Sequence, residues 1–375
     1  EELKAPTNHP GETRFQELDG VRGAAIMLVL CFHYISNNIQ SIEGMDLAPW
    51  QIRLMHTFWL GSMGVDLFFV LSGFLITRIL LLNRESPSLF KTFFARRLCR
   101  ILPLTLLVIG VTLAIRALLP KGPAWDWMFT GQYPVLTYLT FTQNIPMGLH
   151  ESFGGTALAS TWSLAVEEQF YLLMPFMIRF LPLRLLPWLF LLGLPGAWLV
   201  RMHFHDLRGE VWLFGRCDAL LMGCMIAWLY SQIAIRKALS GASAGLHLLW
   251  GFFVLGFVYI NQMPNYFGVA VHSWSTCLWG ATVTILVFCP RGPLGTIFRM
   301  HWLGRLGTIS FGVYLFHFPI LGLLFHFARG EAPFLKTADA LWLPPLALVI
   351  TVILASVSYV LLERPLLRLG HRFRY

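Results

Sequence analysis

The stretch Leu18–Ser36, LDGVRGAAIMLVLCFHYIS, has the length and apolar character of a helix that crosses a membrane. A bilayer core requires about 20 predominantly apolar residues in helical form. Yet this stretch carries Asp19 and Arg22 near its start and His33 deep inside it. Ionisable groups are costly in lipid and usually serve a function there. The stretch therefore predicts a membrane helix that also contributes to a functional site.

The rest of the chain repeats this apolar pattern. Of the 375 residues, 56% are hydrophobic and only 13% are charged, whereas soluble domains have about a quarter of charged residues. Polar stretches at 37–61 and 120–164 are interpreted as loops. We therefore predict an all-α polytopic helix bundle that forms a single membrane domain over residues 1–375. Its ten expected spans are 20–39, 62–82, 101–119, 165–181, 184–200, 211–230, 244–262, 269–289, 308–328 and 341–362.

The distribution of lysine and arginine predicts the orientation of these spans. An even number of spans puts both termini on one side of the membrane. With cytoplasmic termini, 20 of the 28 Lys and Arg residues fall on the cytoplasmic side and 8 on the outer side. This agrees with the excess of cations in cytoplasmic loops. The net charge of +9 is therefore attributed to topology and lipid attraction, and no nucleic-acid partner is expected.

The cysteines and the first residues carry no signal of their own. The six cysteines lie in or beside apolar segments, and they form neither a CxxC motif nor a Cys/His pair with metal-ligand spacing. We therefore expect no metal site. The polar first residues, EELKAPTNHPGETRF, predict that no signal peptide is present.

Arg22 and His33 are predicted to share one face of the first helix. Their spacing corresponds to about three helical turns, or roughly 16 Å along the axis. Asp19 precedes Arg22 by three residues and can pair with it. Two simpler readings stay open, because Arg22 could anchor the helix at the cytoplasmic surface and His33 could form a hydrogen bond between helices.

A second basic signal is the segment FFARRLCRILPL at the cytoplasmic mouth of the third predicted span. Arg97 and Arg100 lie one helical turn apart there. Guanidinium groups bind phosphate through two parallel hydrogen bonds, so the pair could clamp an anion. It could equally be a topology signal, and position alone does not decide between these readings.

The acidic residues of the spans fall in the outer half. Asp66 has no basic residue nearby in sequence, whereas Asp218 is expected to pair with Arg216. Glu167 and Glu168 lie in the first turn of their predicted helix, where the helix dipole favours anions. Cations thus line the inner mouth and carboxylates the outer half. This order suits a polyanionic reagent from the cytoplasm and a hydroxyl-bearing acceptor outside.

Several segments, in this order, resemble the acyltransferase 3 family of integral membrane O-acyltransferases. They are LDGVRGAAIMLVLCFHY, GVDLFFVLSGFLIT, RRLCRILP, STWSLAVEEQFYL, RCDALLMG, GTISFGVYLFHFPIL and LLERPL. The resemblance implies a bacterial multi-pass inner-membrane enzyme that transfers an acyl group, usually acetyl from acetyl-CoA, to hydroxyls of envelope glycans, lipid-linked saccharides or similar acceptors. Some members carry a C-terminal esterase-like domain. The sequence ends at Tyr375, just past the last span, so a stand-alone member is expected.

The resemblance also implies roles for residues. His33 would be the catalytic base or would carry the acyl group itself. Arg22, Arg97 and Arg100 would hold the phosphates of acyl-CoA, and Asp19 would orient Arg22. A carboxylate, either that of Asp66 or the catalytic Glu167, would fix the tautomer of His33. We expect the acceptor to contact Asp66, Trp162, Ser163, Glu168 and His317.

One function of another class stays open. Polar groups at membrane depth are also typical of transporters and channels for small polar solutes or acyl groups. That reading leaves the spacing of Arg97 and Arg100 unexplained, and no internal repeat supports it. His317 lies near the middle of its span, and a hydrogen bond in the core is an alternative role for it.

Overall fold

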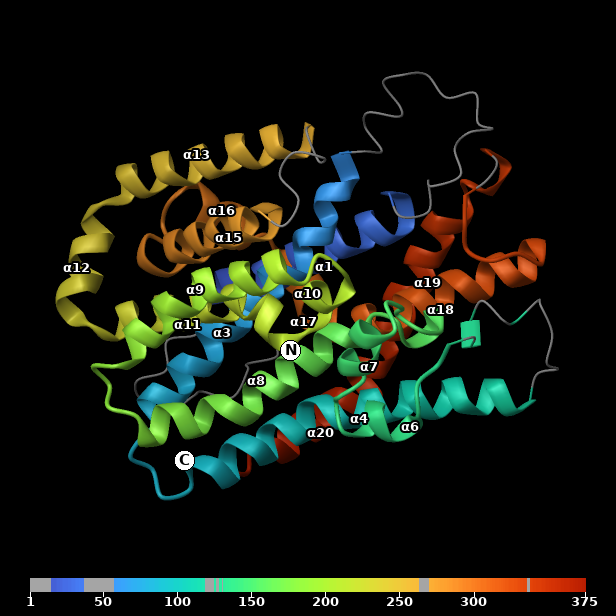
Figure 1. The fold of residues 1–375 in the computed structure, drawn as a ribbon, viewed down its shortest axis with the longest axis horizontal. Coiled ribbons are helices and arrows are strands. Elements are labelled where there is room, and N and C mark those ends of the chain that lie inside the picture. Colours follow the sequence, from blue (N-terminus) through green and yellow to red (C-terminus); the bar gives the residue numbers. More distant parts are fainter. Residues whose placement is uncertain are drawn as a thin grey trace, which may run out of the picture.

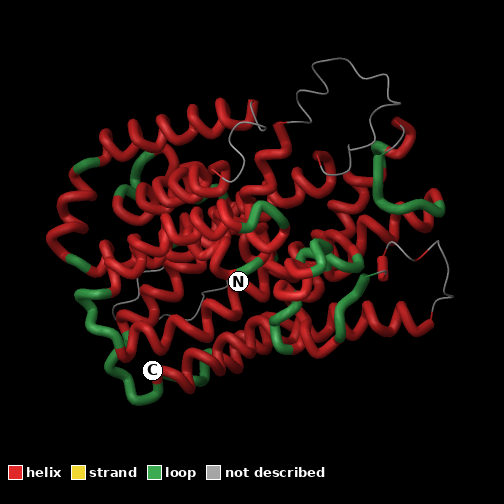
Figure 2. The backbone as a smooth tube through the Cα atoms, viewed as in Figure 1, coloured by secondary structure: helices red, strands yellow, loops and turns green. Residues whose placement is uncertain are grey.

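The computed structural model describes residues 15–36, 57–118, 125, 128–129, 131–262, 270–335 and 338–375. Within these ranges the chain forms helices joined by loops, with no strand (Figures 1 and 2). The prediction of an all-α polytopic bundle is thereby confirmed. Outside the described residues lie most of the predicted 37–61 loop, the start of the 120–164 loop, and Lys4, Arg14, Arg53, Lys121 and Lys336.

Each predicted span coincides with one helix or with consecutive helices. These are α1 (Gln16–Cys31) with the π-helical η1 (Phe32–Ser36), η4 (Phe58–Met63) with α3 (Gly64–Leu82), α4 (Leu89–Leu118), α8 (Thr161–Phe180), α9 (Leu186–His203), α10 (Leu207–Val211) with α11 (Leu213–Ser231), α13 (Ser243–Gln262), α15 (Ala270–Phe288), α18 (Ser310–Arg329), and α19 (Leu343–Ser358) with η7 (Tyr359–Glu363) and α20 (Arg364–Gly370). Shorter helices connect them, namely α6 (Val135–Leu139), α7 (Asn144–Leu149), η5 (Thr156–Leu158), α12 (Ile233–Gly241), α16 (Pro293–Phe298), α17 (His301–Thr308) and η6 (Ala338–Ala340).

Eight helices of the described residues are long and apolar enough to cross a membrane. The helices α8 and α9 are not among them. Helix α8 carries Glu167, Glu168 and Arg179, and α9 carries Arg201 and His203, which lower their apolar character. A multi-pass membrane protein is thus established, while the count of ten spans stays a prediction.

Helix α4 begins at Leu89, well before the predicted start of its span at residue 101. Leu89 and Phe93 are buried, so the first turns of α4 already belong to the bundle. The helix therefore begins before the apolar run from which the span was predicted, because the basic residues of this segment lower its hydropathy. Arg97 and Arg100 therefore lie roughly two to three turns inside the helix rather than at its end.

The centre of the bundle is held by close contact between helix backbones. Helix α3 packs against α11, and both cross the middle of Figure 1. A Cβ atom added at Gly73 would lie 1.9 Å from the carbonyl oxygen of Leu220, and one added at Gly223 would lie 2.0 Å from that of Val70. Such small residues let helices approach closely in membranes. Helix α3 is thereby held beside α11, at the core of the bundle.

Three distant segments meet at one end of the bundle, near the C label of Figure 1. Arg84, between α3 and α4, donates a hydrogen bond of 2.9 Å to the carbonyl of Leu181, after α8. Thr92 donates one of 2.8 Å to the carbonyl of Arg374. The predicted topology puts all three segments on one side of the membrane, and these contacts agree with it. Which side that is stays a prediction.

Candidate active site

A cavity of about 850 Å³, counted with the open space at its mouth, lies between α1, α3, α4, α8 and α18. Five of the residues that the sequence singled out line this cavity. Tyr314, which the sequence analysis did not identify, lines it as well. The polar lining of the cavity includes Arg22, Arg97, Arg100, Ser163, Glu167 and Tyr314.

The three arginines come from α1 and α4. Of the three, Arg22 alone forms an ion pair with a carboxylate among the described residues. Arg22 of α1 pairs with Asp19 at 2.8 Å, as predicted. The guanidinium of Arg97 lies 5.2 Å from the ring centroid of Tyr171. Among the described residues, no carboxylate lies within 4.0 Å of Arg97 or Arg100. The three cations also lie close enough to repel one another. Three arginines face Asp19 and Glu167 here, so an anion entering the cavity would offset a positive charge that these carboxylates balance only in part.

Glu167 lies on the same cavity as the arginines, where its carboxylate interacts electrostatically with Arg100 and Arg97. The sequence had suggested separate positions, with cations inside and carboxylates outside. Helix α8 begins at Thr161, so the prediction that Glu167 and Glu168 lie in the first turn of their helix is wrong. Glu167 lies nearly two turns inside α8, where it faces the arginines of α4 across the cavity. Beside Glu167, the hydroxyl of Ser72 forms a hydrogen bond with that of Tyr171.

His33 is not among the described residues that line the cavity. It lies in the π-helical segment η1, where its ring centroid is 4.3 Å from that of Phe318. Its Nδ1 is 3.1 Å from Nε2 of His317. The helix is α-helical up to Cys31 and changes to π-helix only at Phe32. Arg22 lines the cavity and His33 does not, so their sharing of one helix face stays a prediction.

Helix α18 connects His33 with the cavity. The Nδ1 of His317 lies 2.6 Å from the carbonyl oxygen of Tyr314, one turn earlier in the helix. The hydroxyl of Tyr314 lies 2.6 Å from that of Ser163, and both residues line the cavity. His317 therefore occupies the position next to His33 that the sequence analysis expected a carboxylate to take.

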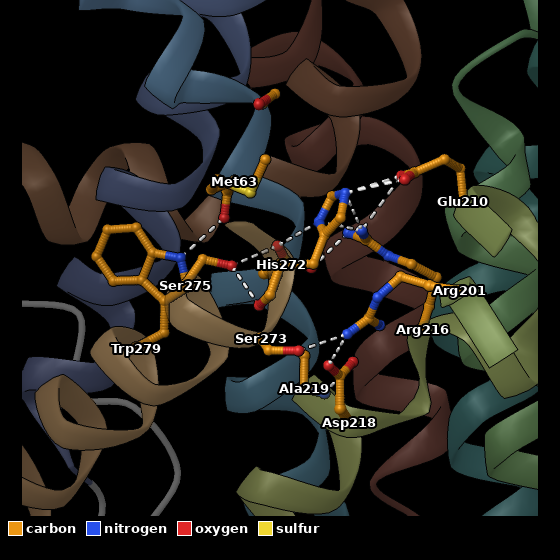
Figure 3. A network of polar contacts seen from close by, with 12 residues as sticks. Met63, Arg201, Glu210, Arg216, Asp218, Ala219, His272, Ser273, Ser275 and Trp279 are labelled. Carbon is orange, nitrogen blue, oxygen red and sulfur yellow. Dashed lines mark hydrogen bonds and ion pairs between the residues drawn. The ribbon is translucent and has the colours of Figure 1, made fainter. Parts of the chain in front are cut away.

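Asp66, at the start of α3, belongs to a separate buried network. Figure 3 shows Arg216, His272, Glu210 and Ser275 of this network. The carboxylate of Asp66 is paired with Arg216, accepts a 2.8 Å hydrogen bond from the Ser275 hydroxyl, and lies 3.3 Å from Nδ1 of His272. Glu210 reaches the other nitrogen of His272 at 2.9 Å and Arg216 at 3.5 Å. This network satisfies a buried carboxylate with partners from α11 and α15, as burial of charge requires.

The predicted pair of Asp218 with Arg216 is wrong. Asp218 instead accepts a 2.7 Å hydrogen bond from Arg201 of α9, which is completely buried and also binds the hydroxyl of Ser273 at 2.8 Å. Both arginines appear beside each other in Figure 3. Arg216 instead pairs with Asp66, a buried carboxylate that needs a counter-charge.

Trp162 and Glu168 are not among the described residues that line the cavity. The guanidinium of Arg216 lies 5.6 Å from the ring centroid of Trp162. The Oε1 atom of Glu168 is buried and has no hydrogen-bond partner in the described part of the chain. Glu168 also lies within electrostatic range of Glu167.

Sequence reasoning missed Tyr171, Tyr314, Glu210 and His272. Helical spacing could have found the first two, since Tyr171 follows Glu167 by one turn and Tyr314 precedes His317 by three residues. Glu210 and His272 carry no local signal, because their partners lie on other helices.

Comparison with known proteins gives a family and several relatives. A family model described as an acyltransferase domain matches residues 15–362. O-acetyltransferase OatA of Staphylococcus aureus is 27% identical, over 99% of this chain and 59% of the relative. Peptidoglycan O-acetyltransferase OatA of Listeria monocytogenes is 29% identical, over 94% of this chain and 56% of the relative. The chain thus spans less than two thirds of these relatives. No solved structure matches it.

Proposed function

The chain belongs to the acyltransferase 3 family, and from this premise we propose that it is a membrane O-acetyltransferase. The donor is acetyl-CoA from the cytoplasm, and the acceptor is a hydroxyl group of a cell-envelope glycan. Two relatives are named O-acetyltransferases, one of them a peptidoglycan O-acetyltransferase, which supports this acceptor class. The glycan strand of peptidoglycan is therefore the first acceptor to test.

The arginine cluster is the observation that carries the proposal. CoA has a diphosphate and a 3′-phosphate, and Arg97 and Arg100 present cations without a carboxylate partner within 4.0 Å among the described residues. Guanidinium groups bind phosphate with paired, charge-assisted hydrogen bonds. Arg22, oriented by Asp19, approaches the same cavity from α1. The phosphates would lie at this cluster, and the acetyl-bearing arm would extend toward Ser163 and Tyr314.

His33 is proposed as the catalytic base. The acceptor oxygen attacks the carbonyl carbon of the thioester as its proton passes to His33, and the carbon–sulfur bond breaks to release CoA. A positioned base of this kind typically contributes 10²–10⁴-fold to the rate. In the second form of the mechanism, His33 is acetylated first and then passes the acetyl group to the acceptor. Both forms need the acyl group to reach His33, which is not among the described residues that line the cavity.

The residues proposed for the acceptor differ in how well their contacts suit that role. Ser163 lines the cavity, which supports contact with a substrate. Asp66 and His317 are already engaged by Arg216 and by His33, so an acceptor would have to displace these contacts or approach beside them. Trp162 offers a ring, although Arg216 lies near it. Glu168 has a buried oxygen without a partner among the described residues, which could accept a hydrogen bond from a sugar hydroxyl.

The proposal is tested with purified protein in detergent, acetyl-CoA and soluble peptidoglycan fragments. We expect release of free CoA that depends on the glycan, together with glycan that has gained the mass of an acetyl group. The His33→Ala protein should give neither product. Absence of acetylated glycan with every envelope glycan tried, together with uptake of a small polar solute into vesicles that contain the protein, would instead support a transporter.

A further inference from the structure

The contacts of His317 decide which nitrogen of His33 carries a proton. His317 is fully buried in α18. Its Nδ1 lies 2.6 Å from the carbonyl oxygen of Tyr314, and its Nε2 lies 3.1 Å from Nδ1 of His33. A carbonyl oxygen accepts hydrogen bonds and cannot donate them. The proton of His317 must therefore be on Nδ1.

A neutral imidazole with a proton on one nitrogen has a lone pair on the other. Nε2 of His317 is then an acceptor, so the 3.1 Å contact requires His33 to donate from Nδ1. This leaves the Nε2 of His33 without a proton. The contact works in the opposite sense only if His317 carries protons on both nitrogens and is positively charged.

The surroundings of His317 argue against the charged form. Its neighbours are the rings of Tyr34, Tyr314 and Phe318 and the ring of His33. The hydroxyl of Tyr34 donates to the carbonyl oxygen of His317 rather than to its ring. In the described part of the chain, no carboxylate lies within ion-pair distance of His317. A buried cation without a counter-charge is strongly disfavoured.

From this geometry we infer that His317 is a positioning residue, which holds His33 in the tautomer with its proton on Nδ1 and a free lone pair on Nε2. The inference rests on the proposed role of His33 as the base. The acceptor's proton would then pass to Nε2 of His33, whose Nδ1–H bond to His317 persists. That proton leaves with CoA as its thiol. An Nε2-protonated His33 could not accept the proton at that atom.

Nitrogen NMR of the substrate-free protein, labelled with ¹⁵N-histidine, reads the tautomer directly. The signal that disappears in His33→Ala belongs to His33, and we expect it to report a proton on Nδ1. His317→Gln should preserve this state, because the amide oxygen of glutamine can accept from Nδ1. His317→Phe fills similar space without an acceptor, so His33 should lose its fixed Nδ1–H form.

The acetyl-transfer rate should follow the tautomer. We expect His317→Gln to stay within about tenfold of the parent and His317→Phe to fall about a hundredfold or more, within the range that a general base contributes. A structural role alone would predict changes in folding without a change of tautomer. A parent His33 that carries its proton on Nε2, or an unchanged signal in His317→Phe, overturns the inference.

The spectrum needs no substrate, and the decisive parent spectrum needs no variant at His317. A His317→Phe protein that fails to fold therefore leaves the inference testable. A protein with the Nδ1 tautomer that transfers no acetyl group would contradict the proposed function but leave the assignment of the tautomer intact. An active protein whose His33 carries its proton on Nε2 would contradict the assignment of the tautomer but leave the proposed function intact.

Discussion

Arg96 and Arg100 are one turn apart in α4, but their side chains meet different groups. Arg100 lines the cavity. Arg96 donates a 2.8 Å hydrogen bond to the carbonyl of Phe373 and lies against the ring of Tyr375. We predict that Arg100→Ala weakens acetyl-CoA binding by about tenfold to a hundredfold, since a hydrogen bond to a charged group contributes roughly 1.5–3 kcal/mol. Arg96→Ala is the matched control and should bind like the parent.

The binding experiment uses well-folded protein in detergent and titration calorimetry. Arg100→Lys should recover affinity only in part, because an ammonium group cannot make the two parallel bonds of a guanidinium. Arg97→Ala should resemble Arg100→Ala. If the affinities of Arg97→Ala and Arg100→Ala equal that of the parent, the cluster is a topology signal and the clamp assignment fails.

Substitution of His33 should affect the transfer rate, whereas substitution of the arginines should affect acetyl-CoA affinity. The reason is that the arginines line the cavity and His33 does not, among the described residues. We predict that His33→Ala lowers the acetyl-transfer rate at least a hundredfold while acetyl-CoA affinity stays near that of the parent. His301, which is exposed in α17, provides a control whose replacement by alanine should change neither quantity. Transfer by His33→Ala at more than about a tenth of the parent rate would remove this residue from the chemistry.

The sequence predicted one contact within a helix, that of Asp19 with Arg22, and missed the contacts between helices. Asp19 and Arg22 pair because three residues of helix bring them together, whatever surrounds them. Asp66 and Arg216 are 150 residues apart, so their pairing depends on how α3 packs against α11. The predicted pair of Asp218 with Arg216 failed within one helix, because residues two apart do not face each other, and the actual partner, Arg201, lies on α9. His317 was found as an intramembrane histidine, but its contact with His33 was not predictable from spacing.

Helices α1 and α17 touch backbone to backbone through Gly307. A Cβ atom there would lie 1.8 Å from the carbonyl oxygen of Asp19, whereas one at Gly304 would have no atom within 4 Å. We predict that Gly307→Ala lowers thermal stability in detergent, because overpacking typically costs about 1–3 kcal/mol. The Gly307→Ala protein should also bind acetyl-CoA less tightly, because Asp19 must move and Asp19 pairs with Arg22.

Gly304→Ala is the control in the same helix. Alanine loses less backbone freedom than glycine in a helix, by roughly 0.5–1 kcal/mol, and here it meets no neighbour. Its melting temperature should therefore equal or exceed that of the parent. Equal melting temperatures for Gly304→Ala and Gly307→Ala would mean that α1 and α17 do not approach as closely as the structure indicates.

Among the elements, the existence of the helices was predictable and their ends were less so. Long apolar runs specify helices because lipid leaves no partner for an unpaired backbone. Helix α4 extends before the apolar run that predicted its span, because the basic residues of that segment reduce its hydropathy although Arg97 and Arg100 line the cavity. The π-helical turn that contains His33 had no sequence signal.

For the whole molecule, contacts at the two ends of the bundle support the alternation of the spans. The connection between α3 and α4 meets the one between α8 and α9 at one end, where Arg179 lies 3.1 Å from Glu85. Near the start of α8, Asn144 of α7 donates a 3.1 Å hydrogen bond to the carbonyl of Val211, just before α11. The bundle therefore has two distinct ends, and the distribution of Lys and Arg predicts which one faces the cytoplasm.

Labelling of introduced cysteines tests that orientation. Glu85 and Leu149 lie near opposite ends in this topology, and both are well exposed, with a side-chain exposure of 84% for Glu85 and a residue exposure of 60% for Leu149. We predict that Leu149→Cys reacts with an impermeant thiol reagent added to intact cells, whereas Glu85→Cys reacts only after the cells are opened. The parent is the control for the six native cysteines, which lie in helices or directly after one. Reaction of Glu85→Cys in intact cells, with Leu149→Cys protected, would place the mouth at Arg97 and Arg100 outside, where cytoplasmic acetyl-CoA could not reach it.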